Sequence, residues 1–198
     1  MSNLFNKLFA MLIFLPLIPL FILISLLIIF KSGTPVFFKQ KRLGLNGNRF
    51  DIIKFRTMVK NAEDILSKDE KLTEYYLKND YKINVNDDPR LTSWGRVLRQ
   101  WSMDELPQFF NVIKGEMNLV GPRPIVPIEI ERYAGIEKKF LSVKPGITGL
   151  WQINGRSDVD YPTRRDLDIH YIDHRTPKYD LWILFQTIAA VISKRGAY

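Results

Sequence analysis

The sequence predicts an α+β fold that is mostly helical, with an N-terminal membrane helix broken at a proline and a small antiparallel β-hairpin. Three observations support this fold class: one long apolar run near the N-terminus, two short strand patterns that flank a turn signal, and several helix patterns that follow. At 198 residues the chain is long enough to bury a core in one domain. We therefore expect a membrane segment over residues 1–33 and a second domain over residues 34–198.

The apolar run extends from Leu8 to Phe30 without a charged residue. A straight helix of this length would cover about 34 Å, enough to cross the core of a bilayer. The run is too long for the apolar part of a signal peptide, and no small-x-small cleavage site follows it. Pro16 and Pro19 lie inside the run and predict a sharp bend, because each removes a backbone donor and clashes with the preceding turn.

Cationic residues flank the apolar run on both sides, with Lys7 before it and Lys31 after it. A single crossing would place one of these flanks on the side that cations avoid. A re-entrant helix that bends at the prolines and returns to the same face removes this conflict. A kinked single crossing is the alternative, because prolines are common in membrane-spanning helices.

The charge balance restricts the partners of the chain. Lys and Arg number 29 against 21 Asp and Glu, which gives a formal net charge of +8. Such an excess favours nucleic acid, an anionic membrane leaflet or phosphorylated substrates. The apolar N-terminal run argues against nucleic acid. The chain has no cysteine, which excludes disulfides and thiol chemistry and is consistent with a reducing compartment.

The two strand patterns are "VFFKQKR" and "RFDIIKFRTM", and the Asn46-Gly47 pair between them is typical of a hairpin turn. Basic side chains recur with period two along both patterns, which predicts that they gather on one face of the hairpin. They are Lys39, Lys41, Lys54 and Arg56. A solvated strand face is the simpler interpretation of this pattern.

Helix patterns follow the hairpin. Residues 59–79 are charged and helix-prone, and a short helix over Trp94–Trp101 has Thr92 or Ser93 as its N-cap. The segment "IVPIEIERYAGIEKKFL" is an amphipathic helix pattern broken near Gly135, and the glycine-rich "KPGITGLWQINGR" predicts a loop or turn.

A C-terminal helix begins at Thr176-Pro177 and continues through "DLWILFQTIAAVISKRG". Its apolar part is too short to span a bilayer. It lies either in the core or in the membrane interface, with Trp182 and Phe185 at the level of the headgroups.

Two adjacent acids, Asp104 and Glu105, stand shortly before Pro107. Since proline is not tolerated deep inside a helix, the helix should begin only a few residues earlier, with both acids at its cap or in its first turn. Acids there complement the free amides and the helix dipole, so helix capping is the simpler interpretation.

A catalytic interpretation of the same stretch rests on Arg123. This residue lies between two prolines in "GPRP", so its backbone is restricted, and a fixed guanidinium suits bidentate binding of phosphate. Free amides at a helix N-terminus also attract phosphate. One carboxylate of the pair could then bind Mg²⁺ while the other attacks a phosphorus atom.

Other groups of residues are weaker candidates. His170 and His174 share a helical face, but no third ligand stands at a telling spacing, which favours a surface or core role over a metal site. The chain has neither a Walker loop nor a dinucleotide fingerprint. Trp94, Trp101 and Trp151 could stack on a nucleobase, although core packing is the simpler role for each.

Nearly the whole chain resembles the bacterial sugar transferases, the monotopic polyprenyl-phosphate phosphoglycosyl transferases. The shared features are the N-terminal apolar segment with its proline and the blocks "KQKRLGLNGNRFDIIKFRTM", "DPRLTSWGRVLR", "SMDELPQFFNVIKGEMNLVGPRP", "KPGITGLWQINGR" and "DLDIHY". The third block is the most specific of these.

The resemblance implies an enzyme of the bacterial inner membrane, with interfacial amphipathic helices around an active site on the cytoplasmic face. Such enzymes transfer a sugar-1-phosphate from a UDP-sugar to undecaprenyl phosphate and release UMP, as the first membrane step of O-antigen, capsule or exopolysaccharide assembly. The resemblance implies that Asp104 is the nucleophile of a phosphosugar-aspartyl intermediate and that Glu105 holds Mg²⁺. It also implies that polar side chains line the substrate and phosphate site, namely Arg123, Arg56, Arg99 and Asp168.

The resemblance further implies the re-entrant topology, with Pro19 at the helix-breaking position of the family and Pro16 nearby. Ile18 departs from the serine that some relatives carry just before this proline, which removes any polar help at the break. Residues 34–198 would then be the catalytic domain with a C-terminal interfacial helix, without the extra N-terminal membrane helices of larger relatives. The implied partners are a UDP-sugar, undecaprenyl phosphate and membrane lipids, with no nucleic acid, and a homodimer stays open.

The sugar is indicated by the C-terminal part of the sequence. The segment "GLWQINGRSDVDYPTRRDLDIHY" and the terminal "RGAY" look most like transferases of galactose- or glucose-1-phosphate, and we favour galactose. Transfer of glucose- or N-acetylhexosamine-1-phosphate is the alternative. A membrane scaffold without activity is a further reading, against which the intact Asp104, Glu105 and Arg123 argue.

Overall fold

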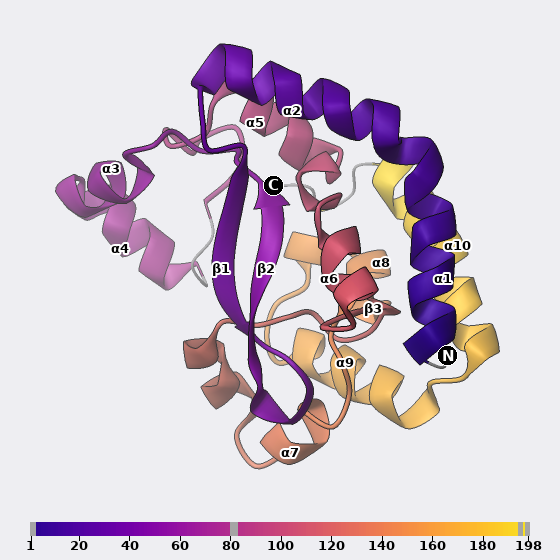
Figure 1. The fold of residues 1–198 in the computed structure, drawn as a ribbon. Coiled ribbons are helices and arrows are strands. Elements are labelled where there is room, and N and C mark those ends of the chain that lie inside the picture. Colours follow the sequence, from indigo (N-terminus) through magenta and orange to yellow (C-terminus); the bar gives the residue numbers. More distant parts are fainter. Residues whose placement is uncertain (1–2, 80–82, 194–195, 197–198) are drawn as a thin grey trace.

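A bent apolar helix begins the computed structural model, which describes residues 3–79, 83–193 and 196 (Figure 1). The helix consists of α1 (Asn3–Phe14), a single 3-10 turn (Leu15–Leu17) and α2 (Ile18–Ser32). Pro16 lies at the start of the 3-10 turn and Pro19 at the start of α2, where the missing amides cost no helical hydrogen bond. The bend predicted from these two prolines is confirmed.

By length and composition, residues 3–32 are long and apolar enough to cross a membrane, and most of this stretch is exposed. The inner side of α1 packs on the rest of the chain. Phe14 stacks on Phe109 with 5.6 Å between the ring centroids, and the buried Asn6 accepts a hydrogen bond of 3.1 Å from the amide of Leu119. Further along, Ile24 and Ile28 of α2 enter a cluster with Phe55 and Leu98. The helix is therefore attached to the body along one side and bare along the other.

The predicted hairpin is formed by β1 (Phe37–Leu43) and β2 (Arg49–Phe55), joined through a short turn at Leu45–Gly47. Asn46 and Gly47 have φ values of 56° and 78°, the left-handed conformation for which this pair is suited. The hairpin signal in the sequence is thus confirmed.

The single basic face predicted for the hairpin is wrong. In the observed register Lys39 and Lys41 lie opposite Ile53 and Asp51, whereas Lys54 lies opposite Phe38. Residues that are paired across two strands point to the same face, so Lys54 points to the face opposite that of Lys39 and Lys41. Because the connection between the strands has five residues, odd-numbered residues of β1 pair with odd-numbered residues of β2. The period-two pattern within each strand does not show how the two strands are paired.

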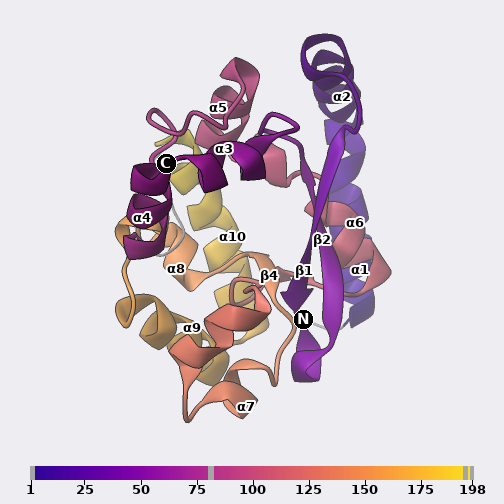
Figure 2. The same cartoon turned by 90° about the vertical axis from the view of Figure 1, so that its left-hand side faces the viewer.

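The helices that follow the hairpin include α3 (Ala62–Lys68) and α4 (Glu70–Lys78), which project from the body (Figures 1 and 2). Next comes α5 (Ser93–Gln100), whose N-cap is Thr92, since the Thr92 hydroxyl accepts the amide of Gly95 at 2.9 Å. Of the two predicted caps, the structure selects Thr92.

Gly95 stands where α5 passes closest to the segment after β2. A Cβ atom at this position would lie 2.0 Å from the carbonyl oxygen of Thr57, a backbone atom that cannot turn away. We expect Gly95→Ala to lower the free energy of unfolding by about 2–3 kcal/mol, because the overpacking must separate two backbone segments. Thermal unfolding in detergent measures this. Ser93→Ala, a change at an exposed position in the first turn of the same helix, is the control, and an equal loss in both variants would contradict the steric explanation.

The middle of the chain contains α6 (Gln108–Lys114) and a parallel pair of three-residue strands, β3 (Asn118–Val120) and β4 (Gly146–Thr148). The segment predicted as a loop therefore holds β4 and the short α8 (Leu150–Ile153). Strands of three residues are too short to show a period in the sequence. The predicted amphipathic helix is broken near Gly135 as expected, but into a 3-10 helix (Pro127–Tyr133) and α7 (Glu137–Phe140).

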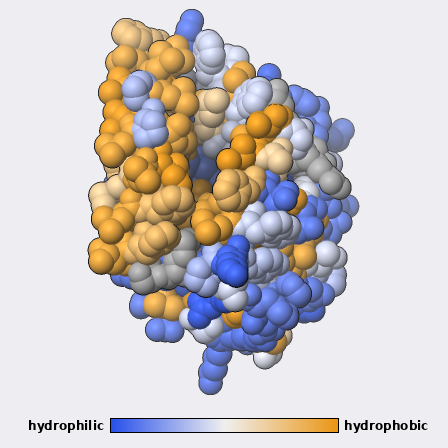
Figure 3. All heavy atoms as spheres, turned by 90° about the vertical axis from the view of Figure 1, so that its right-hand side faces the viewer, coloured by the Kyte–Doolittle hydropathy of each residue, from blue (hydrophilic) through white to orange (hydrophobic). Residues whose placement is uncertain are grey.

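The last two helices are α9 (Thr163–His174) and α10 (Pro177–Ile192), and Thr176 caps α10 as predicted. Figure 2 shows α1, α2 and the hairpin on one side of the molecule and α8, α9 and α10 on the other. The fold is thus α+β and mostly helical, as the sequence predicted. Figure 3 views the side that carries α1 and α10, and shows two hydrophobic areas with a hollow between them.

Candidate active site

The acid pair lies in a 3-10 turn of its own (Met103–Glu105), between α5 and α6. Both acids lie in a first helical turn, as expected, but this turn is a separate 3-10 helix, because α6 begins only at Gln108. Pro107 has no amide to reach the carbonyl of Met103, which instead accepts the amide of Leu106 at 3.2 Å. The turn nevertheless holds Asp104 buried, with 7% of its surface exposed.

Lys54 is the partner of the acid pair that sequence reasoning missed. Its Nζ lies 2.6 Å from Oε1 of Glu105, and both side chains are largely buried. Asn111 of α6 holds this part of β2 in place: its amide nitrogen donates to the Asp51 carbonyl and its oxygen accepts the amide of Ile53. The sequence offered Lys54 only as one of several basic strand residues, and no local signal joins it to a residue 51 positions away.

The two acids differ in their affinity for a proton. Burial raises the pKa of the Asp104 carboxyl, and the charge of Glu105 adds to this while Lys54 and Arg99 oppose it. Burial also acts to raise the pKa of Glu105, but Lys54, Arg123 and Arg156 together lower it below its ordinary value. Neighbouring acids whose pKa values are pushed apart can take different roles. Here Glu105 is held ionised beside cations, and Asp104 carries the more basic carboxylate.

Arginines from four distant segments line this region. Arg123 lies with its guanidinium carbon 5.5 Å from the ring centre of Trp151, and Arg156 is close enough to both acids for their charges to act on its pKa. Arg42 of β1 donates to the carbonyl of Pro124 at 3.2 Å. Burial, and then the charge of Arg123, lower the pKa of Arg42 to about 10. The fourth is Arg164, between the rings of Trp151 and Tyr161.

Several N–H groups of these arginines have no acceptor in the described part of the chain. They are Nε of Arg42, Nη1 of Arg156, and both Nε and Nη2 of Arg164, and all four atoms are buried. Buried charged donors are normally paired, so unpaired ones indicate an anion that belongs among them. Arginine forks are suited to phosphate oxygens.

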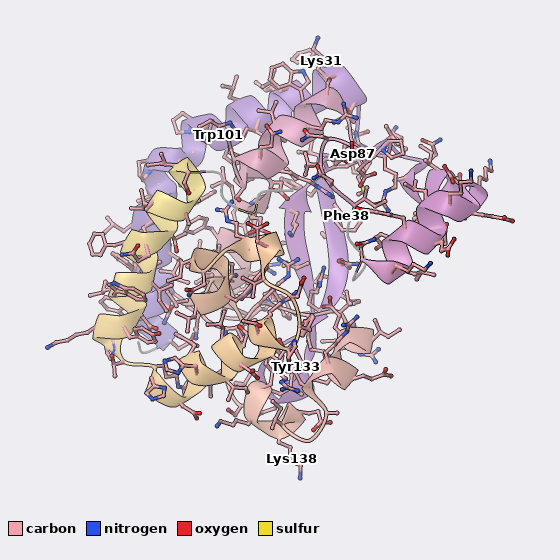
Figure 4. The ribbon with its side chains drawn as sticks, turned by 180° about the vertical axis from the view of Figure 1, so that it is seen from behind. Lys31, Phe38, Asp87, Trp101, Tyr133 and Lys138 are labelled. Atoms are coloured by element: carbon pink, nitrogen blue, oxygen red, sulfur yellow. The ribbon has the colours of Figure 1, made fainter. Side chains whose placement is uncertain are left out.

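Asp168 of α9 lies behind Arg123 in a buried network. It is 1% exposed, and its Oδ2 accepts the hydroxyl of Tyr133 at 2.8 Å. Burial raises the pKa of Asp168 to about 7, although the charges of Arg164 and Arg123 oppose the rise. Figure 4 shows Tyr133 within the body, whereas Lys31 and Lys138 point away from it at opposite ends.

Arg99 and Arg56 occupy different places. Arg99 is near the acid pair, since its charge lowers the pKa of Asp104, and its Nε donates to the Thr57 hydroxyl at 3.1 Å. Arg56 instead caps the end of the apolar helix, where its Nη2 donates to the carbonyls of Ser32 and Gly33 at 2.7 and 2.6 Å. The structure thus gathers Arg99 and Arg123 around the acids and places Arg56 at the end of α2.

The remaining candidates lie elsewhere. His170 and His174 are exposed on α9 with their rings stacked 4.2 Å apart, and no group of three or more metal-ligating side chains exists among the described residues. Trp151 is buried, which confirms core packing for that residue, whereas Trp94 is 40% exposed.

Comparison with known proteins identifies the family. The sequence profile described as bacterial sugar transferase matches residues 1–194, so the chain belongs to this family. The match confirms the resemblance seen in the sequence.

Individual relatives agree with this assignment. The chain is 44% identical to the exopolysaccharide production protein ExoY of Sinorhizobium fredii, over 98% of this chain and 86% of that protein. It is 44% identical to the undecaprenyl-phosphate galactose phosphotransferase of Salmonella typhimurium, over 85% of this chain and 36% of that protein. It is 35% identical to the UDP-glucose:undecaprenyl-phosphate glucose-1-phosphate transferase of Escherichia coli, over 96% of this chain and 39% of that protein. The predicted enzyme class, a phosphoglycosyl transferase, is thereby confirmed.

Proposed function

We propose that this chain transfers a sugar-1-phosphate from a UDP-sugar to undecaprenyl phosphate and releases UMP. The observation that carries the proposal is the acid pair with divergent pKa values, of which Asp104 is buried, next to arginines with buried N–H groups that have no acceptor among the described residues. This arrangement suits a diphosphate, which brings several anionic oxygens to one place. The names of two relatives, which state transfer to undecaprenyl phosphate, support the choice of acceptor.

The proposed reaction has two steps on one phosphorus atom. A carboxylate oxygen of Asp104 attacks the sugar-bearing phosphorus, and the bond from that phosphorus to the UMP oxygen breaks, so UMP leaves with the electron pair. A phosphate oxygen of undecaprenyl phosphate then attacks the same phosphorus and expels Asp104 as a carboxylate. The more basic carboxylate of Asp104 suits the attack, and the positive charges of Arg123 and Arg156 lie where phosphate charge would gather.

Mg²⁺ fits the residues around Glu105. Magnesium in enzymes is commonly bound by one or two carboxylates together with substrate phosphates and water. Glu105 is held ionised, Asp104 is its neighbour, and no larger group of metal-ligating side chains occurs in the part of the chain that the structure describes. We propose that Glu105 holds the ion together with the diphosphate. When bound, Mg²⁺ neutralises phosphate charge and screens the repulsion between the two acids.

The proposed location is the cytoplasmic face of the bacterial inner membrane, with α1 and α2 as a re-entrant helix. Three features support it: the bend at Pro16 and Pro19, the exposed apolar side of this helix, and a second exposed apolar face on α10. Both apolar areas lie on the side seen in Figure 3. A polyprenyl phosphate has its head at the interface and its tail in lipid, so a site beside these areas can receive it.

The test is direct. Membrane-embedded protein is incubated with Mg²⁺, undecaprenyl phosphate and, separately, UDP-galactose, UDP-glucose and UDP-N-acetylgalactosamine. We expect UMP release, fastest with UDP-galactose. Release of UDP in place of UMP would overturn the proposed reaction, and no release with any donor would favour the scaffold.

Lys54 should affect the reaction through the ionisation of Glu105. We expect Lys54→Met to lower the rate of UMP release by about 10²-fold and to move the acidic limb of its pH profile to higher pH, because Lys54 opposes protonation of Glu105. The pH dependence of UMP release measures both effects. Lys41→Met is the matched control, since Lys41 also pairs with a carboxylate, Asp51 at 3.0 Å, but on the exposed face. Equal profiles for the two variants would contradict this role.

A further inference from the structure

A groove of about 460 Å³ lies at the corner where α9 leads into α10. It is separate from the acid pair, since the opposite side of α9 carries the buried Arg164 and Asp168. The residues that line the groove are His170, His174, Thr176, Lys178, Tyr179 and Trp182. No acid is among them, so the polar groups that line the groove are cationic or hydrogen-bonding.

The described acids near this corner have other partners and form no ion pair with its cations. Asp173 is already paired with Lys139 at 2.7 Å, and the buried Asp180 accepts the hydroxyl of Tyr171 at 2.7 Å. Within the described residues, neither Arg175 nor Lys178 forms an ion pair. Lys178 also stands in the first turn of α10, where a cation opposes the helix dipole, so its position brings no benefit to the helix. The charge is therefore available to an anion from outside.

Aromatic and apolar side chains continue from the groove along α10. Tyr179 and Trp182 are stacked with 5.5 Å between their ring centroids, and Trp182 is 46% exposed. Tryptophan and tyrosine with a wet edge are typical of the boundary between headgroups and acyl chains. Beyond them the outer face of α10 is apolar through Leu181, Phe185, Ile188 and Ile192, on the side of the molecule shown in Figure 3. A cationic groove thus stands at the polar end of an apolar stripe.

We propose that this groove binds the phosphate headgroup of an anionic phospholipid. Lys178 and His174 contact the phosphate, Trp182 lies against the glycerol, and the acyl chains follow the apolar stripe. The charge selects an anion, and the stripe selects one with a hydrophobic tail, which a sugar nucleotide or free phosphate lacks. The proposal rests on the membrane orientation proposed above and adds a lipid site that takes no part in the reaction.

The experiment uses the full chain in vesicles of phosphatidylcholine with or without phosphatidylglycerol, followed by native mass spectrometry of the lipids that stay bound. We expect the wild type to retain phosphatidylglycerol selectively and Lys178→Glu to lose this selectivity by at least about fivefold. The matched control is Lys138→Glu, the same charge change at an exposed site on α7. It should behave like the wild type, and equal loss in both variants would overturn the proposal.

Two further measurements separate the explanations. Both variants should still float with vesicles and release UMP in detergent, since Lys178 lies outside the active site; failure of the wild type to float would refute the membrane orientation itself. Flotation without any effect of Lys178→Glu would refute only the lipid site. Retention of phosphatidylglycerol should also survive inorganic phosphate, and displacement by phosphate alone would show that the groove is a general anion site.

Discussion

Replacing Asp104 by asparagine should lower UMP release by at least about 10³-fold and remove the covalent adduct. Asparagine keeps the shape of the side chain but has no anionic oxygen to attack phosphorus. In the wild type, burial raises the pKa of Asp104 while the charges of Lys54 and Arg99 oppose the rise, so its carboxylate is more basic than an ordinary one. The measurement is the intact mass after incubation with UDP-sugar and no lipid acceptor. The wild type should gain one sugar phosphate and the variant none.

Two further variants help to interpret the result for Asp104→Asn. Asp51→Asn is the control, because Asp51 is also a carboxylate paired with a lysine, but its side chain on β2 is half-exposed. It should release UMP at close to the wild-type rate. Glu105→Gln should raise the Mg²⁺ concentration needed for half-maximal rate, since Glu105 is the proposed metal ligand. An adduct that persists in Asp104→Asn would place the covalent step on another residue.

Local signals in the sequence predicted local structure well. The two prolines predicted the bend between α1 and α2, and Asn46-Gly47 predicted the hairpin turn. Thr92 and Thr176 predicted helix starts, because each hydroxyl accepts an amide three residues ahead. In each case the residues that cause the feature are neighbours in the sequence, so no knowledge of distant contacts was needed.

Features that depend on distant segments could not be predicted. The pairing of odd with odd residues across the hairpin divides its basic side chains between two faces, and only the connection between the strands fixes that pairing. The bond from Lys54 to Glu105 depends on Asn111, which holds β2 against α6. Likewise the β3–β4 pair forms because segments 118–120 and 146–148 are brought together by the rest of the fold.

The sequence pointed to residues of the candidate site but not to their arrangement. The rigid "GPRP" segment indicated phosphate binding by Arg123, and the structure places Arg123 where its charge acts on Glu105. The residues whose roles were implied only by the resemblance lie in different places in the structure. Arg99 lies by the acids, whereas Arg56 caps α2 and Asp168 sits in a buried network behind Arg123. These three residues differ in their burial and in their hydrogen-bond partners, and neither property can be read from the sequence.

Replacing Asp168 by asparagine should change how stability depends on pH. The pKa of Asp168 is raised to about 7 in the folded protein from an ordinary value of 3.8, so the folded state binds this proton more tightly than the unfolded state does. The contribution of Asp168 to stability is therefore fully present below about pH 4 and is lost as pH rises through about 7. The full loss is on the order of 4 kcal/mol, from a shift of about three units at 1.36 kcal/mol each.

Asparagine carries no charge at any pH, so it should behave like protonated Asp168 at low pH. At higher pH it should not show the loss of stability that ionisation of Asp168 causes. We expect the free energy of unfolding of Asp168→Asn to equal that of the wild type near pH 4 and to exceed it increasingly up to about pH 7, after which the difference is constant. Unfolding of both proteins in detergent across this pH range measures the difference between their free energies of unfolding. The pH dependence that comes from all other groups is common to both proteins and cancels in this difference. Asp166→Asn, an exposed change on the same helix, should give a difference that stays near zero. A difference for Asp168→Asn that does not vary with pH would mean that Arg164 and Tyr133 keep Asp168 ionised in the folded protein, because their interactions would then outweigh its burial.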